Sequence, residues 1–313
     1  MNAGMVAEWL ASGELDLPLP GRGSTAARWR RLAALTETDI VAGRLAEAHA
    51  DAVAILADLE GPDVQPHELW GVWAAEAPDA VVQASDAGNG VTLDGTKAWC
   101  SGAGLCSHAL VTARMSSGDR GLFAVPLRRP AVRPLPSTWR NPGMAQSDTR
   151  SVHFSGAPAI PVGQPGDYLS RPGFWHGAIG VSACWLGGAR SVAKPLYDRG
   201  ADGGADPHAL AHLGAVDAAL AAGEAILMAA AAEVDADPLN RKGSAELIAR
   251  RVRAVVETAV DQVINRTARA LGPGPLCQDA DHAQRVADLT IYVRQSHAER
   301  DLEQLGRLAG QKR

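Results

Sequence analysis

The sequence predicts an α+β protein in which N-terminal helices precede a middle β-barrel-like domain and a C-terminal helical bundle. Two observations predict this class. Before residue 60 and again after residue 173, apolar residues recur every three or four positions, which is the period of an amphipathic helix. Between about residues 69 and 161, short apolar runs alternate with Gly, Pro, Asn and Asp, as is typical of strands and hairpins. We therefore expect a short helical domain over 1–68, a β domain over 69–165 and a helical bundle over 166–313.

Composition and charge exclude several classes of partner. The 313 residues are 46% hydrophobic and 21% charged, which is ordinary for a folded globular protein. Lys and Arg number 30 against 35 Asp and Glu, so the formal net charge is -5 and no global basic field exists to hold nucleic acid or an anionic membrane. The long apolar stretch from Leu210 to Val234 contains Asp217 and Glu224, which favours a helix of the bundle over a membrane span.

The cysteines and the N-terminal segment predict a reducing compartment. The four cysteines are Cys100, Cys106, Cys184 and Cys277. They include no C-x-x-C pair and are too sparse for a disulfide scaffold or a zinc site, so we expect them to be reduced. The segment from Met1 to Leu17 has neither a basic n-region nor a long apolar run, so no signal peptide is evident and we expect the cytoplasm.

The N-terminal region carries one clear helical stripe. Val41, Leu45 and Leu56 belong to a set of apolar positions at steps of three and four. Thr36, with Asp39 three residues later, resembles a capping box at the start of this helix, and Gly61-Pro62 ends it.

In the middle region, turn residues delimit the strands. The candidate strands are residues 91–93, 108–113, 121–125 and 151–154. Asn89-Gly90 and Asp94-Gly95 bracket the first of them as turns. Several prolines between residues 126 and 142 rule out a helix there.

The C-terminal region reads as a series of helices. Asp206-Pro207 indicates an N-cap followed by proline at the first helical position. A second helix is predicted over 246–271 and a last one over 280–309. His208 and His212 share a helix face, but no third ligand lies near them in the sequence, so we expect no metal site.

A tryptophan and a serine near the end of one candidate strand form a candidate binding surface. Trp99 and Ser101 are two residues apart, so on a strand they point to the same face. An indole beside a hydroxyl suits a planar aromatic ligand, because the ring can stack while the hydroxyl bonds to a heteroatom on the ligand's edge. The alternative is that Trp99 belongs to the core. No helix pattern follows Gly102-Ala103-Gly104, which favours a turn between strands over a nucleotide cradle.

These residues carry a resemblance to a known family. The run Gly-Thr-Lys-Ala-Trp-Cys-Ser-Gly-Ala at 95–103 resembles the G-x-K-x-W-I-[TS]-x-[AG] strand of the acyl-CoA dehydrogenase family. Gly-Met-Ala-Gln-Ser-Asp-Thr at 143–149 resembles the family's G-M-x-x-S-x-T turn, and 151–154 the strand after it. Ala157-Pro158 stands where the family's V-P leaves the β domain. The order of helix, β and helix matches as well, so the resemblance covers about 69–308.

The resemblance implies a flavin, usually FAD with FMN possible, held between the β domain and the helical bundle, commonly with help from a neighbouring subunit. By position, Trp99, Cys100 and Ser101 would lie against the isoalloxazine ring. The cofactor residues implied further are Trp73, Ala75 and Glu76, in the place of the family's T-E-P-x-x-G-S-D run, and Arg199, which resembles the arginine before its F-G element. Here Glu76 stands where the family has threonine, the G-S-D is absent, and no phenylalanine follows Arg199.

The resemblance leaves the catalytic base open. The family removes an α proton with a glutamate, in many members from a Y-E-G-T motif that the corresponding region 291–301 lacks. His297 or Glu299 could serve, since either accepts a proton when its pKa is tuned by burial and neighbours. The alternatives are that Glu299 belongs to a solvated helix face and that His297 is structural. Related flavin monooxygenases pair a serine with a late histidine, which Ser101 and His297 would match.

Three functions follow as expectations. The first is flavin-dependent α,β-dehydrogenation of a small acyl thioester, such as an acyl-CoA, by a homo-oligomer. The second is a flavin-dependent monooxygenase that uses Ser101 and His297. The third is a catalytically silent subunit in a hetero-oligomer with an active homologue, because the glutamate motif and the G-S-D are missing.

Overall fold

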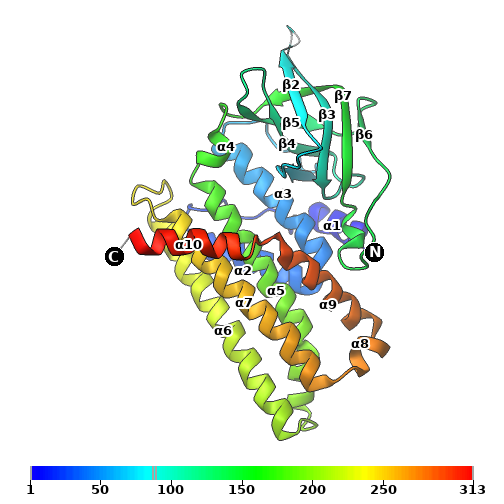
Figure 1. Ribbon diagram of the computed structural model, residues 1–313, viewed down its shortest axis with the longest axis vertical. Coiled ribbons are helices and arrows are strands. Elements are labelled where there is room, and N and C mark those ends of the chain that lie inside the picture. The colour runs from blue at the N-terminus through cyan, green and yellow to red at the C-terminus, as the bar shows by residue number, and fades with distance from the viewer. Residues whose placement is uncertain (1, 87, 89, 312–313) are drawn as a thin grey trace. The chain divides into compact units, whose positions relative to one another are not determined.

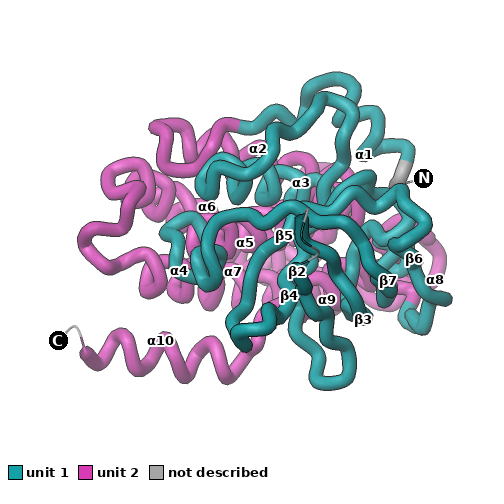
Figure 2. The backbone as a smooth tube through the Cα atoms, turned by 90° about the horizontal axis from the view of Figure 1, so that it is seen from above, with its two compact units in different colours: residues 1–17, 45–141, 145–174 teal, residues 18–44, 142–144, 175–313 magenta. Residues whose placement is uncertain are grey.

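A computed structural model describes residues 2–86, 88 and 90–311 of the chain (Figure 1). It confirms the predicted class, with N-terminal helices, a barrel-like sheet and C-terminal helices. The chain forms two compact units, coloured in Figure 2: unit 1 comprises residues 1–17, 45–141 and 145–174, and unit 2 comprises 18–44, 142–144 and 175–313. The domain boundaries expected from the sequence stay a prediction.

The two units contain the following elements. Unit 1 holds α1 (Asn2–Ala11), most of α3 (Ile40–Asp58), β1 (Trp70–Trp73), β2 (Val82–Asp86), β3 (Val91–Cys100), β4 (His108–Arg114), β5 (Arg120–Pro126), β6 (Val132–Pro134), η1 (Ala145–Ser147), β7 (Arg150–Pro161) and α4 (Asp167–Ser170). Unit 2 holds α2 (Thr25–Thr38), nearly all of α5 (Gly173–Ala201), α6 (Pro207–Ala236), α7 (Ala245–Leu271), α8 (Gly274–Gln278), α9 (Ala280–Tyr292), η2 (Val293–Gln295) and α10 (Glu299–Gln311).

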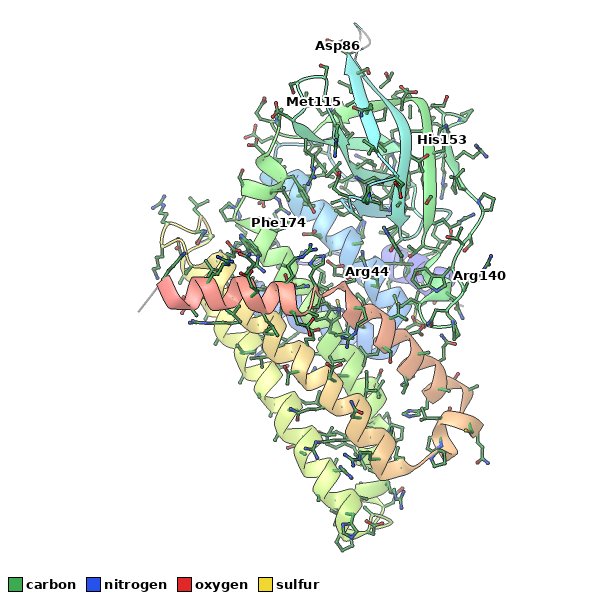
Figure 3. The ribbon with its side chains drawn as sticks, viewed as in Figure 1. Arg44, Asp86, Met115, Arg140, His153 and Phe174 are labelled. Carbon is green, nitrogen blue, oxygen red and sulfur yellow. The ribbon has the colours of Figure 1, made fainter. Side chains whose placement is uncertain are left out.

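The strands of unit 1 close on themselves. The hydrogen-bonded order is β1-β4-β2-β3-β7-β5. Because β4 also pairs with β5, the strands β4, β2, β3, β7 and β5 form a closed ring. Strand β1 is attached to this ring at β4, and β6 is attached at β7. Most pairs are antiparallel, but β1 and β2 both run parallel to β4. In the long β3–β7 pairing Thr96 faces His153, labelled in Figure 3, and the Thr96 hydroxyl lies 3.2 Å from His153 Nδ1. Strand β3, which carries the candidate binding surface, is paired with β2 on one side and with β7 on the other.

Side chains of the barrel alternate between two apolar clusters. On β4 and β5, Val111 and Phe123 face one cluster, whereas Leu110 and Leu122 face the other. This period of two is the one that strand geometry imposes. The second cluster also takes in Ile55 of α3, so this helix covers one outer face of the barrel. The barrel is therefore filled on its inside and sealed by α3 on part of its outside.

The expected capping box is wrong in detail. Two helices stand where one stripe was predicted, and Asp39 separates them. The Asp39 carboxylate accepts a 2.7 Å hydrogen bond from the N–H of Ala42, so Asp39 caps α3. The hydroxyl of Thr36 instead donates to the carbonyl of Leu32 within α2. A threonine inside a helix can satisfy its hydroxyl on the preceding turn, which removes it from capping.

The strand predictions over 91–125 and 151–154 are confirmed, with two differences. Asp94-Gly95 is not a turn, because β3 runs through it with a register shift between Leu93 and Gly95 opposite β7. Gly95 has a φ of 120°, a backbone that a β-bulge can use and side-chain-bearing residues rarely adopt. Strands β1, β2 and β6 were not predicted. Asn89, from the other expected turn, lies outside the described residues.

The C-terminal helices agree with the sequence until the last one. Asp206 caps α6, accepting the N–H groups of His208 at 2.9 Å and Ala209 at 2.8 Å. The expected final helix is broken between Gln295 and Glu299. There the Ser296 hydroxyl bonds to the carboxylate of Glu257 and accepts the N–H of Ala298, which takes a left-handed φ of 46°. The bond to Ala298 offers the backbone a local alternative to the helix, and the bond to Glu257 of α7 holds Ser296 in that position.

Helix α6 is also the one described helix long and apolar enough to cross a membrane by length and composition. Figure 1 shows it running along α7 in unit 2, and a third of its apolar window is buried there. A core helix of a bundle has the same length and composition, so this is weak support for a membrane span.

Candidate functional site

Trp99 is an exposed tryptophan in a strained conformation. Its residue is 62% exposed, whereas Trp73, Trp29 and Trp185 are 2% exposed or less. Its φ is 61°, in the left-handed region. Bulky residues there carry strain of about 1–3 kcal/mol, which persists only when the surroundings hold it, often at binding sites. The interpretation of Trp99 as a core residue is therefore wrong, and its ring is available to a ligand.

A second tryptophan supports the Trp99 ring from the side. The Trp139 ring meets it edge to face, with centroids 6.4 Å apart and planes at 83°. Trp139 lies in the loop between β6 and η1, next to Arg140, which Figure 3 labels. Edge-to-face packing fixes an aromatic ring while leaving one of its faces uncovered.

The backbone that follows Trp99 is anchored in the barrel core. The β3–β7 register shifts between Lys97 and Cys100, so regular strand alternation does not extend to Ser101, which lies in the turn after β3. Cys100 is fully buried, and burial raises the pKa of its thiol far above the ordinary value. The buried Trp73 donates its indole N–H to the carbonyl of Ser101 at 3.0 Å. Trp73 thus positions the turn from inside the core.

Three hydroxyls form a chain that begins at Ser101. The Thr149 hydroxyl donates to Ser101 Oγ at 3.0 Å, and Thr149 Oγ1 lies 2.7 Å from Ser147 Oγ. Ser147 ends η1 and is buried, whereas Ser101 and Thr149 are half-buried. Sequence reasoning missed Ser147 and Thr149 as site residues, although both belong to the 143–149 run that carries the resemblance.

The turn after β3 is clamped to the turn before β7. The N–H groups of Gly102 and Ala103 donate to the carbonyls of Ser147 and Asp148, at 2.8 Å and 3.1 Å. The Asp148 carboxylate accepts the N–H of Gly104 at 2.7 Å and pairs with Arg150. These amides are engaged by protein, so the segment is a turn, as predicted, and not a phosphate cradle.

Glu76 and Lys97 form a partly buried ion pair. Lys97 Nζ donates to Glu76 Oε1 at 3.0 Å and to the hydroxyl and carbonyl of Thr112 at 2.7 Å and 2.9 Å. Burial lowers the pKa of Lys97, although the Glu76 carboxylate opposes this shift. Burial also opposes the ionisation of Glu76, but the hydrogen bond and charge of Lys97 hold the pKa of Glu76 below its ordinary value. The side chain of Glu76 is therefore engaged within unit 1.

The remaining expected cofactor residues lie at the ends of elements. Ala75 is exposed in the segment after β1. Arg199 is in the last turn of α5, where its guanidinium donates to the carbonyls of Gly204 at 3.2 Å and Ala270 at 3.4 Å. Such bonds satisfy carbonyls that a helix end leaves open. A role of either residue in binding a cofactor stays a prediction.

The two expected catalytic residues of unit 2 are both exposed. His297 precedes α10, its side chain is 66% exposed, and its Nδ1 lies 3.8 Å from the Asp301 carboxylate. Glu299 stands exposed in the first turn of α10. Ser101 belongs to unit 1, so the expected Ser101–His297 pair is divided between the two units and stays a prediction.

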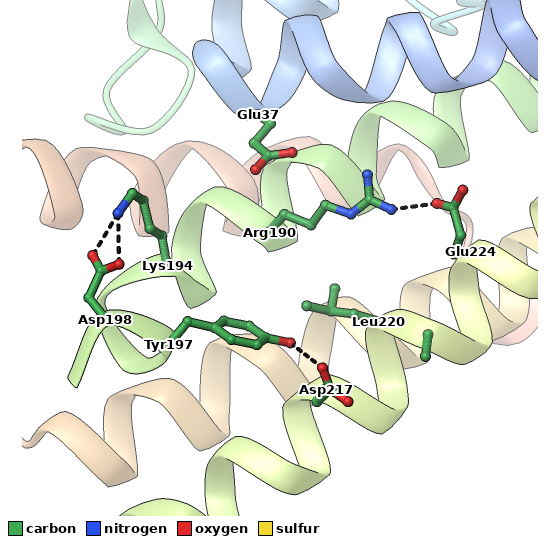
Figure 4. A pocket seen from close by; sticks show the side chains of 9 residues that line it. Glu37, Arg190, Lys194, Tyr197, Asp198, Asp217, Leu220 and Glu224 are labelled. Atoms are coloured by element: carbon green, nitrogen blue, oxygen red, sulfur yellow. Dashed lines mark hydrogen bonds and ion pairs between the residues drawn. The ribbon is translucent and has the colours of Figure 1, made fainter. Parts of the chain in front are cut away.

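Unit 2 also contains an open pocket of about 570 Å³ between α2, α5 and α6 (Figure 4). Its charged groups are largely paired with one another: Arg190 with Glu224, and Lys194 with Asp198. The Tyr197 hydroxyl donates to Asp217 at 2.9 Å, and burial, with this bond, raises the pKa of Tyr197 to about 12. None of the residues expected to bind a cofactor lines this pocket.

Comparisons with known proteins identify the fold. No family model and no curated protein matches the sequence. Among solved structures, the chain is similar to the dibenzothiophene monooxygenase TdsC from Paenibacillus sp. A11-2, solved with FMN and indole: 18% identity, all of this chain, 96% of the other and a TM-score of 0.79. The methanesulfinate monooxygenase MsuC from Pseudomonas fluorescens has 17% identity over all of this chain and 95% of its own, also with a TM-score of 0.79.

A dehydrogenase is similar as well. A glutaryl-coenzyme A dehydrogenase in complex with glutaryl-CoA shares 15% identity over 86% of this chain and 75% of its own, with a TM-score of 0.73. At these identities the likeness concerns the backbone alone. It agrees with the order of helices, barrel and helices described above, and the chain therefore has the acyl-CoA dehydrogenase-like fold.

Proposed function

We propose that the protein is a flavin-dependent monooxygenase acting on a small molecule. The observation that carries the proposal is the exposed indole of Trp99, held at a φ of 61° beside the turn of Ser101, whose hydroxyl accepts from Thr149 and has no acceptor for its own proton among the bonds found in the described residues. An isoalloxazine ring needs a flat apolar surface for its face and donors for the heteroatoms on its edge, and these two residues supply both.

In this proposal each residue of unit 1 has a defined task. Trp99 packs against the ring, Trp139 fixes the orientation of Trp99, and Ser101 donates its hydroxyl proton to an acceptor on the ring edge. Trp73 and the clamp at Asp148 hold the turn that carries Ser101. The chemistry that a bound, reduced flavin supplies is two electrons for O₂, so that one oxygen atom enters the substrate and the other leaves as water.

Oxygenation is favoured over dehydrogenation for two reasons. Two of the three solved structures compared above are monooxygenases, and one of these was solved with FMN, which makes FMN the first cofactor to test and FAD the second. Removal of an α proton from an acyl thioester needs a base, and region 291–301 lacks the glutamate motif that supplies this base in many members of the family that the chain resembles. Dehydrogenation of an acyl thioester is the second candidate, supported by the likeness to glutaryl-coenzyme A dehydrogenase.

The proposal extends to substrate, proton transfer and surroundings. TdsC and MsuC are named as monooxygenases of dibenzothiophene and methanesulfinate, which are both sulfur compounds, so we propose a small substrate with a sulfur atom to oxidise. His297 is proposed as the acid or base, as the resemblance suggests. We also propose that the protein assembles as a homo-oligomer. For its location we propose the cytoplasm, because the buried free thiols of Cys100, Cys106 and Cys184 suit a reducing compartment.

The experiment is a comparison of two activities after loading with flavin. Purified protein is incubated with FMN or FAD and its visible spectrum is recorded. O₂ consumption is then measured with chemically or enzymatically reduced flavin and a panel of thioethers, sulfinates and aromatic amines, and reduction of an artificial electron acceptor is measured with acyl-CoAs. Substrate-dependent O₂ consumption with an oxygenated product supports the proposal. Acceptor reduction by an acyl-CoA alone would favour the dehydrogenase, and no flavin binding would favour a silent subunit.

A further inference from the structure

Within the Ser147–Thr149–Ser101 chain, the hydrogen bond between Thr149 and Ser101 has a defined direction. A hydroxyl has a single proton to donate and two lone pairs to accept with. The proton of Thr149 goes to Ser101 Oγ at 3.0 Å. Thr149 Oγ1 also lies 2.7 Å from Ser147 Oγ, and this short contact holds the Thr149 side chain in place.

This direction determines what Ser101 can offer a ligand. Ser101 Oγ already accepts from Thr149, and its own proton has no acceptor among the bonds found in the described residues. The Ser101 carbonyl is held by Trp73, so the residue cannot rotate as a whole. Ser101 is therefore presented as a donor. Without a donor at position 149, nothing would hold the Ser101 hydroxyl in this orientation, and its proton could rotate away from the ligand.

The residue that sets the direction is itself well held. Thr149 follows Asp148, whose carboxylate binds Gly104 and Arg150, and whose carbonyl binds Ala103. Asp148 has a φ of 47°, a conformation that non-glycine residues rarely adopt. The two turns therefore keep Thr149 and Ser101 at a constant distance.

We propose that Thr149 is a positioning residue that orients the Ser101 hydroxyl as a hydrogen-bond donor toward an acceptor on the edge of a bound flavin, with the contact to Ser147 holding Thr149 in place. This inference rests on the proposed function, because the acceptor is an atom of the flavin. The oxidised isoalloxazine edge carries carbonyl oxygens and a ring nitrogen that can only accept, which matches a donor at Ser101.

The test is equilibrium binding of FMN and FAD to wild type, T149V, T149S, S101A and the double variant S101A/T149V, followed by flavin absorbance and fluorescence. We expect T149V to weaken binding about 3–10-fold, the range of one neutral hydrogen bond, and T149S to stay within about 2-fold of wild type. The visible band of bound flavin should shift in T149V and S101A, but not in T149S. Because Thr149 acts through Ser101, adding T149V to S101A should have no further effect on affinity.

A matched control is available in Thr258, an exposed threonine of α7 whose hydroxyl donates to the carbonyl of Ala254. T258V makes the same chemical change and should bind flavin as wild type does. Urea unfolding of every variant identifies those that are misfolded, and T149S keeps the test interpretable if T149V is one of them. A wild type that binds neither flavin overturns the proposed function and this inference with it. Two results overturn only the role of Thr149. One is that T149V binds flavin as tightly as wild type does. The other is that T149V lowers the flavin affinity of S101A as much as it lowers that of wild type.

Discussion

The ammonium group of Lys97 lies 3.0 Å from the carboxylate of Glu76, and the two side chains differ in exposure, at 2% and 31%. The pair is therefore asymmetric, because Lys97 is sealed in the barrel while Glu76 retains access to water. Thr112 donates its hydroxyl to the same Glu76 oxygen at 3.0 Å. Loss of either partner should have unequal consequences for stability.

Removing the carboxylate should destabilise the protein more than removing the ammonium. Glu76→Ala leaves the Lys97 charge buried without a counter-charge, and we expect a loss of about 2–3 kcal/mol in the free energy of unfolding, less than for a fully buried pair because Glu76 is partly exposed. Lys97→Met removes the buried charge and should change stability by less than about 1 kcal/mol. Urea denaturation of both variants measures the difference, and a larger loss in Lys97→Met would contradict this asymmetry.

The same carboxylate predicts a pH dependence. The pKa of Glu76 is lowered below its ordinary value of 4.5, so the folded protein binds this proton less tightly than the unfolded chain does. Its contribution to stability is thus complete above pH 4.5 and declines as the pH falls through the folded-state pKa. In Glu76→Gln, which retains an oxygen acceptor for Lys97 and Thr112, this component should be absent. Unfolding free energies of wild type and Glu76→Gln between pH 3 and pH 6 should therefore converge toward low pH, and parallel curves would count against the assignment.

Truncation of the two tryptophans of the site should destabilise the protein to very different extents. Trp99→Ala removes an exposed ring whose main described contact is the edge of Trp139, so we expect less than about 1 kcal/mol of lost stability. Trp73→Ala empties part of the barrel core and frees the Ser101 carbonyl, and should lose about 3–5 kcal/mol. Thermal and urea unfolding compare the two. A Trp99→Ala variant as unstable as Trp73→Ala would show that the Trp99 ring is structural.

One cysteine should react with thiol reagents in the native state. Cys100, Cys106 and Cys184 are buried, and burial raises the pKa of the Cys100 thiol, whereas Cys277 is exposed in α8. We expect iodoacetamide to label Cys277 rapidly and the other three only after denaturation. Peptide mapping by mass spectrometry identifies the site, and Cys277→Ser should abolish fast labelling. Rapid native labelling of Cys100 would mean that the end of β3 opens to solvent.

The order of elements could be predicted from the sequence because local signals determine it. Asp206 followed by proline fixes the start of α6, and the capping hydrogen bonds are those expected of this pair. Errors arose where tertiary contacts override a local signal. Asp94-Gly95 resembles a hairpin turn, but in the barrel these residues pair with the neighbouring strand β7 and form a bulge within β3. Likewise, the bond from Ser296 to Glu257 of α7 interrupts an otherwise continuous helical pattern.

The candidate site was predictable in part. The pair Trp99 and Ser101 could be singled out from residue type alone, but the reason offered, regular alternation on a strand, fails at the register shift before Cys100. The left-handed backbone conformation of Trp99 could not be predicted, because no local sequence pattern indicates it. The bond from Thr149 joins positions 48 residues apart in the sequence, so only the folded barrel brings it to Ser101.

Titration of the purified protein with FMN, and separately with FAD, tests the central claim most directly. Tryptophan fluorescence and the visible flavin band are followed together for wild type, Trp99→Ala and Ser101→Ala. The account predicts saturable binding to wild type, with quenching of tryptophan emission, and weaker binding to both variants while their unfolding curves stay close to wild type. Wild-type protein that binds neither flavin, or a Trp99→Ala variant that binds as tightly as wild type, would contradict it.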